Sequence, residues 1–284
     1  MFPLTAAELQ ALVAAALAED IGPGDVTTAA CVPEAAQARA RLVARTPLTL
    51  AGRALAEAAF RAVDPHLDLD PHADDGAAVP AGDLVIEVSG SARAILTAER
   101  VALNFVQHLS GVATLTRKFV DAVAGTRARI LDTRKTTPGW RRLEKYAVAC
   151  GGGVNHRFGL GDLVLIKDNH LAALAGEKPD PIAAAVARAR AARPYLRVEV
   201  EADTLAQVEQ ALAAGADIIL LDNMPPATLR EAVRLAAGRA LLEASGGVSL
   251  ASVRGIAETG VDFISVGALT HSAPAADLGL DFVA

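Results

Sequence analysis

The spacing of apolar and polar residues predicts a helix followed by a half-exposed strand at the start of the chain. Thr5 and Glu8 form a capping-box sequence, and the apolar residues after them recur every three or four positions, as in a helix with one buried face. After a glycine- and proline-rich break, polar and small apolar residues alternate over residues 36–45. Such alternation predicts a strand with one face toward solvent.

A hairpin and a long helix are predicted next. The segments 84–88 and 92–96 are both typical of strands and are separated by Ser-Gly, which favours an antiparallel hairpin. From about Thr97 to about Val123 the apolar residues keep helical spacing, so one long helix is expected to join two domains. The first hundred residues therefore predict a mixed α+β domain.

Beyond this helix, short aliphatic runs alternate with amphipathic helices. This alternation predicts the parallel strands of an α/β barrel. Segments 214–219 and 259–264 repeat one arrangement, a glycine turn before an aspartate and a buried strand. Six strands are fewer than the eight of a complete barrel, so either two are hidden within 151–161 and 171–181 or the barrel is incomplete. The six strands are predicted near Ile130, Leu163, Val198, Ile218, Leu241 and Phe263.

Composition and charge narrow the function. The 284 residues are 52% hydrophobic but only 4% aromatic, which fits a core of aliphatic strands and thin helices. A net charge of -6 argues against a general role on nucleic acid or on a membrane surface. Between Asp132 and His170, however, seven cations stand against four acids. This local excess favours a small anionic ligand, although solvated helix faces would explain part of it.

The cysteines and the hydropathy predict a cytoplasmic protein. Cys31 and Cys150 are far apart and lack CxxC spacing, which argues against both a disulfide framework and a zinc site. The first twenty residues have no basic segment before an apolar run, and no stretch has the length and apolarity of a membrane span. We therefore expect neither a signal peptide nor a membrane anchor.

Each predicted barrel strand ends in a polar or glycine-rich segment. The active site of a barrel is built at the carboxyl ends of its strands, so these segments are the candidates for chemistry. One polar end carries little weight, because helix caps need polar residues too, but six together predict an active site. They are Asp132 to Lys135, Lys167 to His170, Glu199 to Glu201, Asp222-Asn223, Glu243 to Gly247 and Ser265 to Ala268.

The last two ends are predicted to bind a phosphate group. Glycine lets backbone N–H groups approach a phosphate closely, and this position near the end of a barrel is where such sites form. The alternative is that the glycines only shape tight turns. The predicted phosphate-binding residues are Ser245, Gly246, Gly247, Val266, Gly267 and Ala268.

Two carboxylates and several cations complete the predicted site. Glu201 and Asp222 end neighbouring strands and offer the hard oxygen ligands that suit Mg²⁺ on a phosphorylated substrate, or else they cap helices. Arg134 can hold a carboxylate through two hydrogen bonds, whereas lysines act as point charges. Internal salt bridges are the alternative for any one cation, but as a set they favour a ligand. The other members are Lys135, His156, Arg157 and Lys167.

Taken together, these motifs resemble the quinolinate phosphoribosyltransferases, also called nicotinate-nucleotide pyrophosphorylases (carboxylating), of NAD biosynthesis. The resemblance runs nearly from end to end, and only the 171–181 loop has no match. The matching segments are Glu19-Asp20, Gly24 to Thr28, Thr97 to Arg100, Asp132 to Thr136, Gly151 to Gly159, Lys167 to His170, Glu199 to Glu201, Leu221 to Asn223, Ser245 to Gly247 and Val266 to Ser272.

The resemblance implies both a fold and a reaction. The fold is an N-terminal α/β sandwich domain over 1–114 and an incomplete, TIM-like α/β barrel over 115–269, with a tail, 270–284, that could return to the first domain. The reaction transfers a phosphoribosyl group from 5-phosphoribosyl 1-pyrophosphate to quinolinate with decarboxylation, giving nicotinate mononucleotide, CO₂ and pyrophosphate. The enzyme is thus a pentosyltransferase and a homodimer, or a higher assembly.

The resemblance also implies the residue roles. Glu201 and Asp222 serve the ribose and Mg²⁺ and act in catalysis together with Lys135, which contacts the 2-carboxylate. The two glycine loops hold the 5-phosphate, and Arg100 reaches the site of a neighbouring subunit. Quinolinate is surrounded by Arg100, Thr133, Arg134, Lys135, His156, Arg157 and Lys167.

Two other functions stay open from the sequence. A related phosphoribosyltransferase-like protein linked to molybdenum uptake shares the fold and phosphate loops but takes another acceptor. A non-catalytic anion-binding barrel would need only some of the predicted phosphate, metal and acceptor ligands. The Lys167 to His170 motif and the intact arginines favour quinolinate, and the combined phosphate, metal and acceptor ligands disfavour a purely binding protein.

Overall fold

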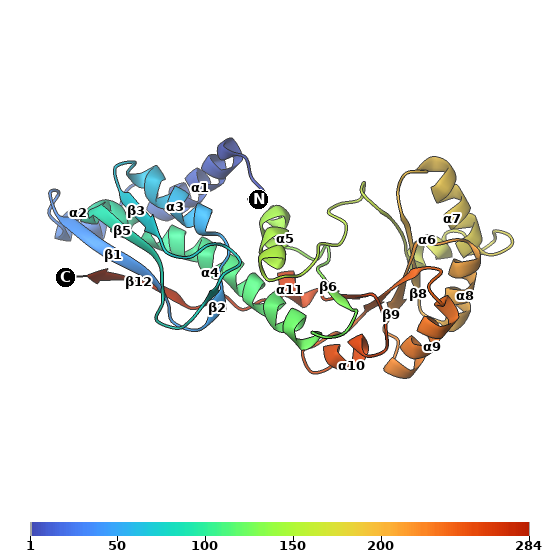
Figure 1. Cartoon of the computed structure of the whole chain (residues 1–284). Coiled ribbons are helices and arrows are strands. Elements are labelled where there is room, and N and C mark those ends of the chain that lie inside the picture. The colour runs from blue at the N-terminus through green and yellow to red at the C-terminus, as the bar shows by residue number, and fades with distance from the viewer. Residues whose placement is uncertain (1, 284) are drawn as a thin grey trace. The chain divides into compact units, whose positions relative to one another are not determined.

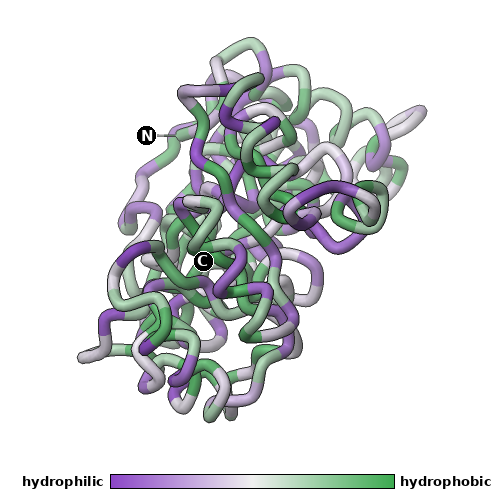
Figure 2. Tube along the Cα trace, turned by 90° about the vertical axis from the view of Figure 1, so that its right-hand side faces the viewer, coloured by the Kyte–Doolittle hydropathy of each residue, from purple (hydrophilic) through white to green (hydrophobic). Residues whose placement is uncertain are grey.

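The structure is a computed structural model that describes residues 2–283, and its chain forms two compact units. Unit 1 comprises Met1–Arg117, Thr137–Gly152 and Leu269–Ala284, and unit 2 comprises Lys118–Thr136 and Gly153–Ala268. Figure 2 shows hydrophobic residues spread along the whole trace, as expected for two cores. Among the described residues, no helix combines the length and apolarity needed to cross a membrane.

Unit 1 is built on an antiparallel sheet in the order β12-β1-β5-β3. The predicted strand over 36–45 is β1, and its outward residues are exposed while Ala40, Leu42 and Ala44 are buried. The last strand, β12, pairs with β1, so the C-terminal tail lies in this sheet. The strands are β1 (Gln37–Ala44), β3 (Asp68–Pro71), β5 (Leu84–Ser91) and β12 (Leu278–Val283), with a separate pair β2 (Leu48–Thr49) and β4 (Ala78–Val79).

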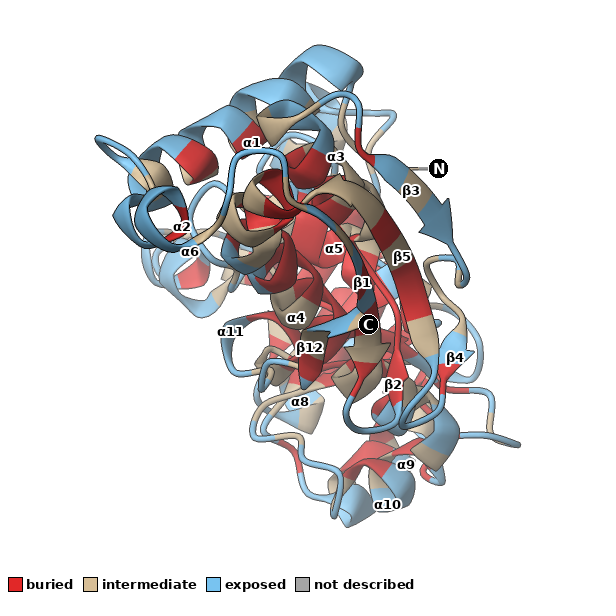
Figure 3. Ribbon diagram, turned by 90° about the vertical axis from the view of Figure 1, so that its left-hand side faces the viewer, coloured by how far each residue is buried: buried red, intermediate tan, exposed pale blue. Residues whose placement is uncertain are grey.

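The first helix forms as its sequence predicts. The side chain of Thr5 accepts the N–H of Glu8, and Glu8 in turn accepts the N–H of Thr5 at 2.8 Å, which completes the capping box. Only Val13 and Leu17 of this helix are buried, and Figure 3 shows the rest of α1 largely exposed. The helices within unit 1 are α1 (Ala6–Ile21), α2 (Val26–Cys31), α3 (Arg53–Val63) and α5 (Arg141–Cys150).

The predicted hairpin over 84–88 and 92–96 is wrong. Strand β5 continues through the Ser-Gly pair to Ser91, and helix α4 (Ala92–Ala122) begins directly after it. Gly90 does not turn the chain; it stays in the sheet opposite Ala38 with a φ of 138°, where a Cβ would lie 2.8 Å from Cδ2 of Leu67. The residues after it bury a helical face instead of alternating, so the long predicted helix starts five residues earlier.

Segment Thr137–Gly152 belongs to unit 1, although the sequence places it in the barrel domain. Three contacts explain this. The ring of Trp140 stacks on Phe105 at 5.5 Å between centroids, and Glu144 pairs with His108 at 3.0 Å. A Cβ at Gly151 would lie 2.4 Å from the carbonyl oxygen of Ala113, so only glycine fits against α4.

Unit 2 is an open parallel sheet in the order β6-β11-β10-β9-β8-β7. The prediction of an incomplete barrel with fewer than eight strands is confirmed. Within 151–161, Val154 forms one parallel bridge to Leu131, while 171–181 holds the end of one helix and the start of the next. The strands are β6 (Arg129–Leu131), β7 (Val164–Ile166), β8 (Val198–Ala202), β9 (Ile218–Asp222), β10 (Leu241–Ser245) and β11 (Phe263–Ser265).

The aspartates of the repeated glycine-aspartate turns form hydrogen bonds to the first residues of neighbouring strands. Asp217 accepts the first N–H of β8 at 2.6 Å, and Asp262 accepts the N–H of Leu242 in β10 at 2.9 Å. Gly215 and Gly260 adopt φ values of 77° and 94°, which suit glycine. Figure 1 shows helices packed beside these strands: α6 (Asp168–Ala172), α7 (Pro181–Ala192), α8 (Leu205–Ala213), α9 (Pro226–Ala236) and α10 (Val253–Ala257), with α11 (Ala268–His271) after β11.

Candidate active site

The parallel sheet of unit 2 brings the predicted strand ends to one edge. Because all six strands run in the same direction, their carboxyl ends share one side of the sheet. Side chains alternate along a strand, so Glu199 and Glu201 of β8 point to one face, and so do Glu243 and Ser245 of β10. Apart from Arg100, every predicted site residue belongs to unit 2.

Lys167 and the two predicted metal-binding carboxylates form the first part of the site. The Nζ of Lys167 lies 2.6 Å from an Oε of Glu201, in a half-buried ion pair. Asp222 accepts a hydrogen bond of 2.6 Å from the Asn223 side chain. Burial, with repulsion from Glu201 and Asp203, raises the pKa of Asp222 despite that hydrogen bond. These carboxylates are close enough to repel one another, and a cation between them would relieve the repulsion.

The first glycine loop follows β10 and is held against the end of β9. Gly246 and Gly247 adopt φ values of 95° and 58°. A Cβ at Gly246 would lie 2.1 Å from Oδ1 of Asn223, whereas one at Gly247 would meet open space. The positive φ values fit a tight turn at both glycines, and the open space at Gly247 also leaves room for a ligand. In the second loop, the N–H of Val266 bonds to Leu131, and α11 begins at Ala268 after Gly267.

Arg134 and Arg157 lie close enough to repel each other at the carboxyl end of the sheet. Thr133 accepts the N–H of Lys135 at 3.0 Å in the turn after β6, which also contains Arg134. Burial and repulsion from Arg134 lower the pKa of Arg157. The Nε of Arg157 is buried without a hydrogen-bond partner, although its Nη1 lies 3.4 Å from the carbonyl oxygen of Leu163. An anionic ligand would satisfy that donor and reduce the repulsion.

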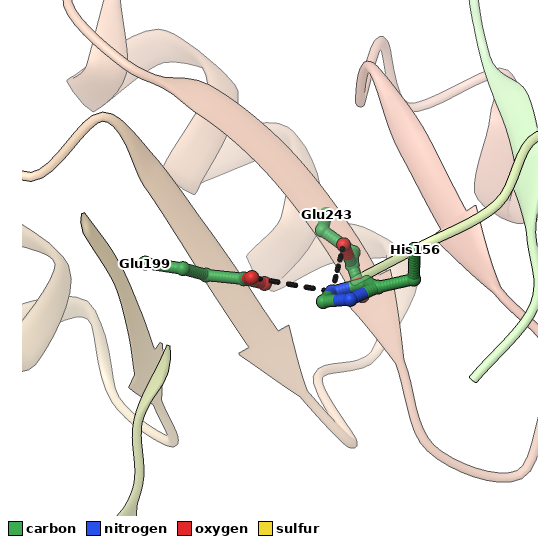
Figure 4. A group of neighbouring side chains, drawn as sticks. All are labelled: His156, Glu199 and Glu243. Carbon is green, nitrogen blue, oxygen red and sulfur yellow. Dashed lines mark ion pairs between the residues drawn. The ribbon is translucent and has the colours of Figure 1, made fainter. Parts of the chain in front are cut away.

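His156 lies between two buried glutamates that the sequence analysis placed at strand ends without giving them a role. Its Nε2 is 3.2 Å from Glu199 and 3.4 Å from Glu243, as Figure 4 shows. Glu199 is 0% and Glu243 1% exposed. Burial opposes protonation of the ring, but the two carboxylates outweigh it and raise the pKa of His156, so the coupled cluster as a whole holds an extra proton at neutral pH. A glutamate that points inward from a barrel strand, where aliphatic residues dominate, is the signal that could have identified them.

The extra proton of this cluster belongs to the three side chains jointly. The Nδ1 of His156 accepts the N–H of Arg157 at 2.7 Å, which places the ring's proton on Nε2, toward the glutamates. Burial and the neighbouring Glu243 also raise the pKa of Glu199. We therefore place the second proton on the carboxylate pair rather than on Nδ1.

Arg100 belongs to unit 1, whereas the other predicted site residues belong to unit 2. It is on α4, its side chain is 57% exposed, and its guanidinium is 3.9 Å from Glu99. The structure thus brings Thr133, Arg134, Lys135, His156, Arg157, Lys167, Glu201, Asp222 and both glycine loops to one sheet edge, while their individual roles stay predictions.

The fold and the site define an α/β-barrel enzyme for a multiply anionic substrate. Comparison with known proteins agrees. Residues 25–110 match the family model described as quinolinate phosphoribosyl transferase, N-terminal domain, and residues 112–281 match the model of its C-terminal domain. The chain belongs to the quinolinate phosphoribosyltransferase family.

Individual relatives are similar along nearly the whole chain. A nicotinate-nucleotide pyrophosphorylase (carboxylating) from Mycobacterium leprae is 47% identical, covering 94% of each chain. The chloroplastic protein of that name from Arabidopsis thaliana is 43% identical, covering 96% of this chain and 82% of its own. The solved nicotinate-nucleotide pyrophosphorylase of Francisella tularensis has a TM-score of 0.92 and 41% identity, covering 100% of this chain and 99% of its own. The predicted family and enzyme class are confirmed.

Proposed function

We propose that this chain catalyses the reaction of its family: quinolinate and 5-phosphoribosyl 1-pyrophosphate give nicotinate mononucleotide, CO₂ and pyrophosphate. One observation carries the proposal. Cations, carboxylates and two glycine loops lie at one edge of a single parallel sheet, in a chain whose relatives are named for this reaction. Separate anion sites for an acceptor and for a phosphorylated donor fit this substrate pair.

The arginines and lysines form the acceptor side of the proposed site. Arg134 and Arg157 repel each other, and a pyridine dicarboxylate would bring two negative charges to them. Lys135 is exposed at the turn and is our candidate for contacting the 2-carboxylate. Lys167 already pairs with Glu201, so it can link the acceptor side to the donor side.

The glycine loops and the carboxylates form the donor side. The open space at Gly247 and the backbone of the Gly267-Ala268 turn suit the 5-phosphate of the ribose. Glu201 and Asp222 are hard oxygen donors at neighbouring strand ends, and burial, together with repulsion from Glu201, raises the pKa of Asp222. We therefore propose that they hold Mg²⁺, which would neutralise the departing pyrophosphate.

In this reaction the protein mainly positions the two substrates and stabilises the charge that develops on them. The pyridine nitrogen attacks C1 of the ribose while the bond from C1 to pyrophosphate breaks. The carboxylates of Glu201 and Asp222 stabilise the positive charge that develops on the ribose. The alkylated, cationic ring then accepts the electron pair left when the 2-carboxylate departs as CO₂, and a proton replaces that group. Arg134, Arg157 and Lys135 hold the ring in place throughout.

We further propose a homodimer that works in the cytoplasm. The exposed guanidinium of Arg100 on α4 supports a shared site, because it is available to a neighbouring subunit. Cys31 and Cys150 are both free thiols, which supports a reducing compartment. The partner subunit would thus supply one cation to each acceptor site.

A product assay tests the proposal. Purified protein with Mg²⁺, quinolinate and 5-phosphoribosyl 1-pyrophosphate should form nicotinate mononucleotide and CO₂ in equal amounts. Chelation of Mg²⁺ should abolish product formation. A mixture of Arg100→Ala and Lys135→Ala subunits, each inactive alone, should recover part of the activity if sites are shared. No product would refute the activity, and no recovery would refute the sharing of Arg100.

A further inference from the structure

Glu199 and Glu243 have no part in the reaction described above, yet both are buried in the interior of the barrel. They come from β8 and β10, the alternate strands that flank β9, and side chains from alternate strands share one interior layer. Oε2 of Glu199 meets Nε2 of His156 as an ion pair at 3.2 Å, and Oε1 of each glutamate has no hydrogen-bond partner. Burying carboxylates in this way opposes folding, so their presence calls for a function.

The three side chains are close enough together to be considered as a metal site. Ligand atoms of His156, Glu199 and Glu243 all lie within 4.8 Å of one another. The ring geometry argues against a metal, however. The Nδ1 of His156 accepts the N–H of Arg157 at 2.7 Å, so the neutral ring carries its proton on Nε2, the atom that faces the glutamates. A protonated Nε2 donates hydrogen bonds and cannot ligate a metal ion.

The same ring contact reaches Arg157. The N–H of His156 donates to Asp132 at 2.7 Å, and Val154 bridges Leu131, so this segment is fixed to β6 from one side. From the other side, the glutamates fix Nε2, and the opposite nitrogen fixes the main chain of Arg157. The path from Glu199 to Arg157 therefore consists of two successive contacts through one rigid ring.

Arg157 needs such support because it faces another cation. Arg134 repels it, and Glu199 attracts it. Without a fixed main chain, the two guanidinium groups would move apart and lose the spacing that a dicarboxylate requires. Glu199 and Glu243 thus supply negative charge near Arg157, and through His156 they hold its main chain in place.

We propose that Glu199 and Glu243 are positioning residues for the acceptor: they fix His156 in its Nε2-protonated form, and through it they hold Arg157 in place to bind a substrate carboxylate. The inference rests on the proposed function only for the identity of that substrate. The arrangement of the ring is a property of the protein itself and is measurable without turnover.

Kinetics of matched variants test the positioning role. Glu199→Gln and Glu243→Gln should each raise KM for quinolinate about tenfold, as expected for the loss of one supporting charged contact, and should change KM for phosphoribosyl pyrophosphate much less. Glu258→Gln, at the half-exposed residue that caps the end of α10 in the same unit, is the control and should change neither value. Equal effects on both substrates, or none, would overturn the proposal.

A double-mutant cycle tests whether the glutamates act through the ring. In a His156→Ala background, Glu199→Gln should have no further effect on KM for quinolinate, because the connecting group is gone. Simple additivity of the two substitutions would contradict the proposed path. Thermal unfolding of the same variants separates this role from a purely structural one, since the midpoint should not fall in Glu199→Gln.

Nitrogen NMR of the wild-type protein provides a measurement independent of variants and of activity. The chain has six histidines, so ¹⁵N-histidine labelling gives few signals, and His156→Gln identifies the one of interest. We expect its Nε2 to be protonated and its Nδ1 to be unprotonated. Protonation at Nδ1, alone or together with Nε2, or stoichiometric metal that is lost in Glu243→Gln, would overturn the proposal. If the wild type forms no product but the ring shows this tautomer, then only the proposed reaction fails.

Discussion

Each unit of the molecule contains a buried glutamate beside a histidine, and the two pairs differ in how their charges are satisfied. Glu144 in unit 1 is 0% exposed, and its two oxygens accept hydrogen bonds of 3.0 Å from His108 and from the N–H of Thr137. Glu199 in unit 2 is equally buried, but only its Oε2 has a polar partner, the Nε2 of His156 at 3.2 Å, and its Oε1 has no hydrogen bond. The same two residue types thus form a saturated pair in one unit and an unsaturated pair in the other.

The difference separates polar groups that stabilise a fold from polar groups that prepare a site. The hydrogen bonds of Glu144 join α5 to α4 and to the turn before α5, so this glutamate holds unit 1 together. Glu199 makes fewer polar contacts than Glu144. Its carboxylate faces the ring of His156, which contacts Arg157 at the proposed substrate-binding edge. Burial alone therefore does not identify a structural glutamate. The number of its carboxylate oxygens that accept hydrogen bonds does.

The largest predicted effect is on stability, at Glu144. Glu144→Ala leaves the Thr137 N–H and the His108 ring without their acceptor, and should lower the free energy of unfolding by about 3 kcal/mol. Trp140, the sole tryptophan, lies in unit 1 against Phe105 and reports this transition by its fluorescence in urea. A loss below about 1 kcal/mol would show that Glu144 is no more structural than Glu199.

The second predicted effect is on binding, at Arg134. Arg134→Ala should weaken use of quinolinate by more than about 1.5 kcal/mol, the lower range for charged hydrogen bonds. Stability should not fall, because the substitution removes the charge that repels Arg157. The ratio kcat/KM for quinolinate measures the first effect, and urea unfolding measures the second. Lower stability with unchanged kinetics would place Arg134 among the structural residues.

The smallest predicted effect is at a helix cap in unit 1. Asp25 accepts the N–H of Thr28 at 2.9 Å at the start of α2, and Asp25→Ala should cost about 1 kcal/mol. The hydrogen bonds from Thr28 lower the pKa of Asp25. Its contribution is therefore present above the pKa of the unfolded chain and is lost as pH falls through the folded value. Asp25→Asn should reduce this acid dependence, and an unchanged dependence would refute the assignment.

The fold of unit 2 could be predicted from sequence because its signals are local. Each of the six strands is a short aliphatic run between glycine turns and amphipathic helices, and each was placed within a few residues. The start of α4 at Ala92 was missed because the Ser-Gly pair before it fits either a hairpin turn or a continuing strand. Ser-Gly marks a turn in many hairpins, but here Gly90 packs on Leu67, a residue distant in sequence, and the strand continues.

The candidate site was predicted less completely than the fold. Residues at strand ends were identifiable because topology alone brings them together. The partners of His156 were not, since pairing with Glu199 and Glu243 depends on which face of β8 and β10 is internal. The membership of Thr137–Gly152 in unit 1 also depends on long-range contacts, such as that of Trp140 with Phe105.

The pairing of β12 with β1 has a consequence for how the chain folds during synthesis. Residues 278–283 leave the ribosome after every strand of unit 2, yet they complete the sheet that begins with residues 37–44. Unit 2 can assemble while β1 still has an open edge on one side. The sheet that begins before unit 2 in the chain is therefore completed after it, and until then one edge of β1 is unpaired.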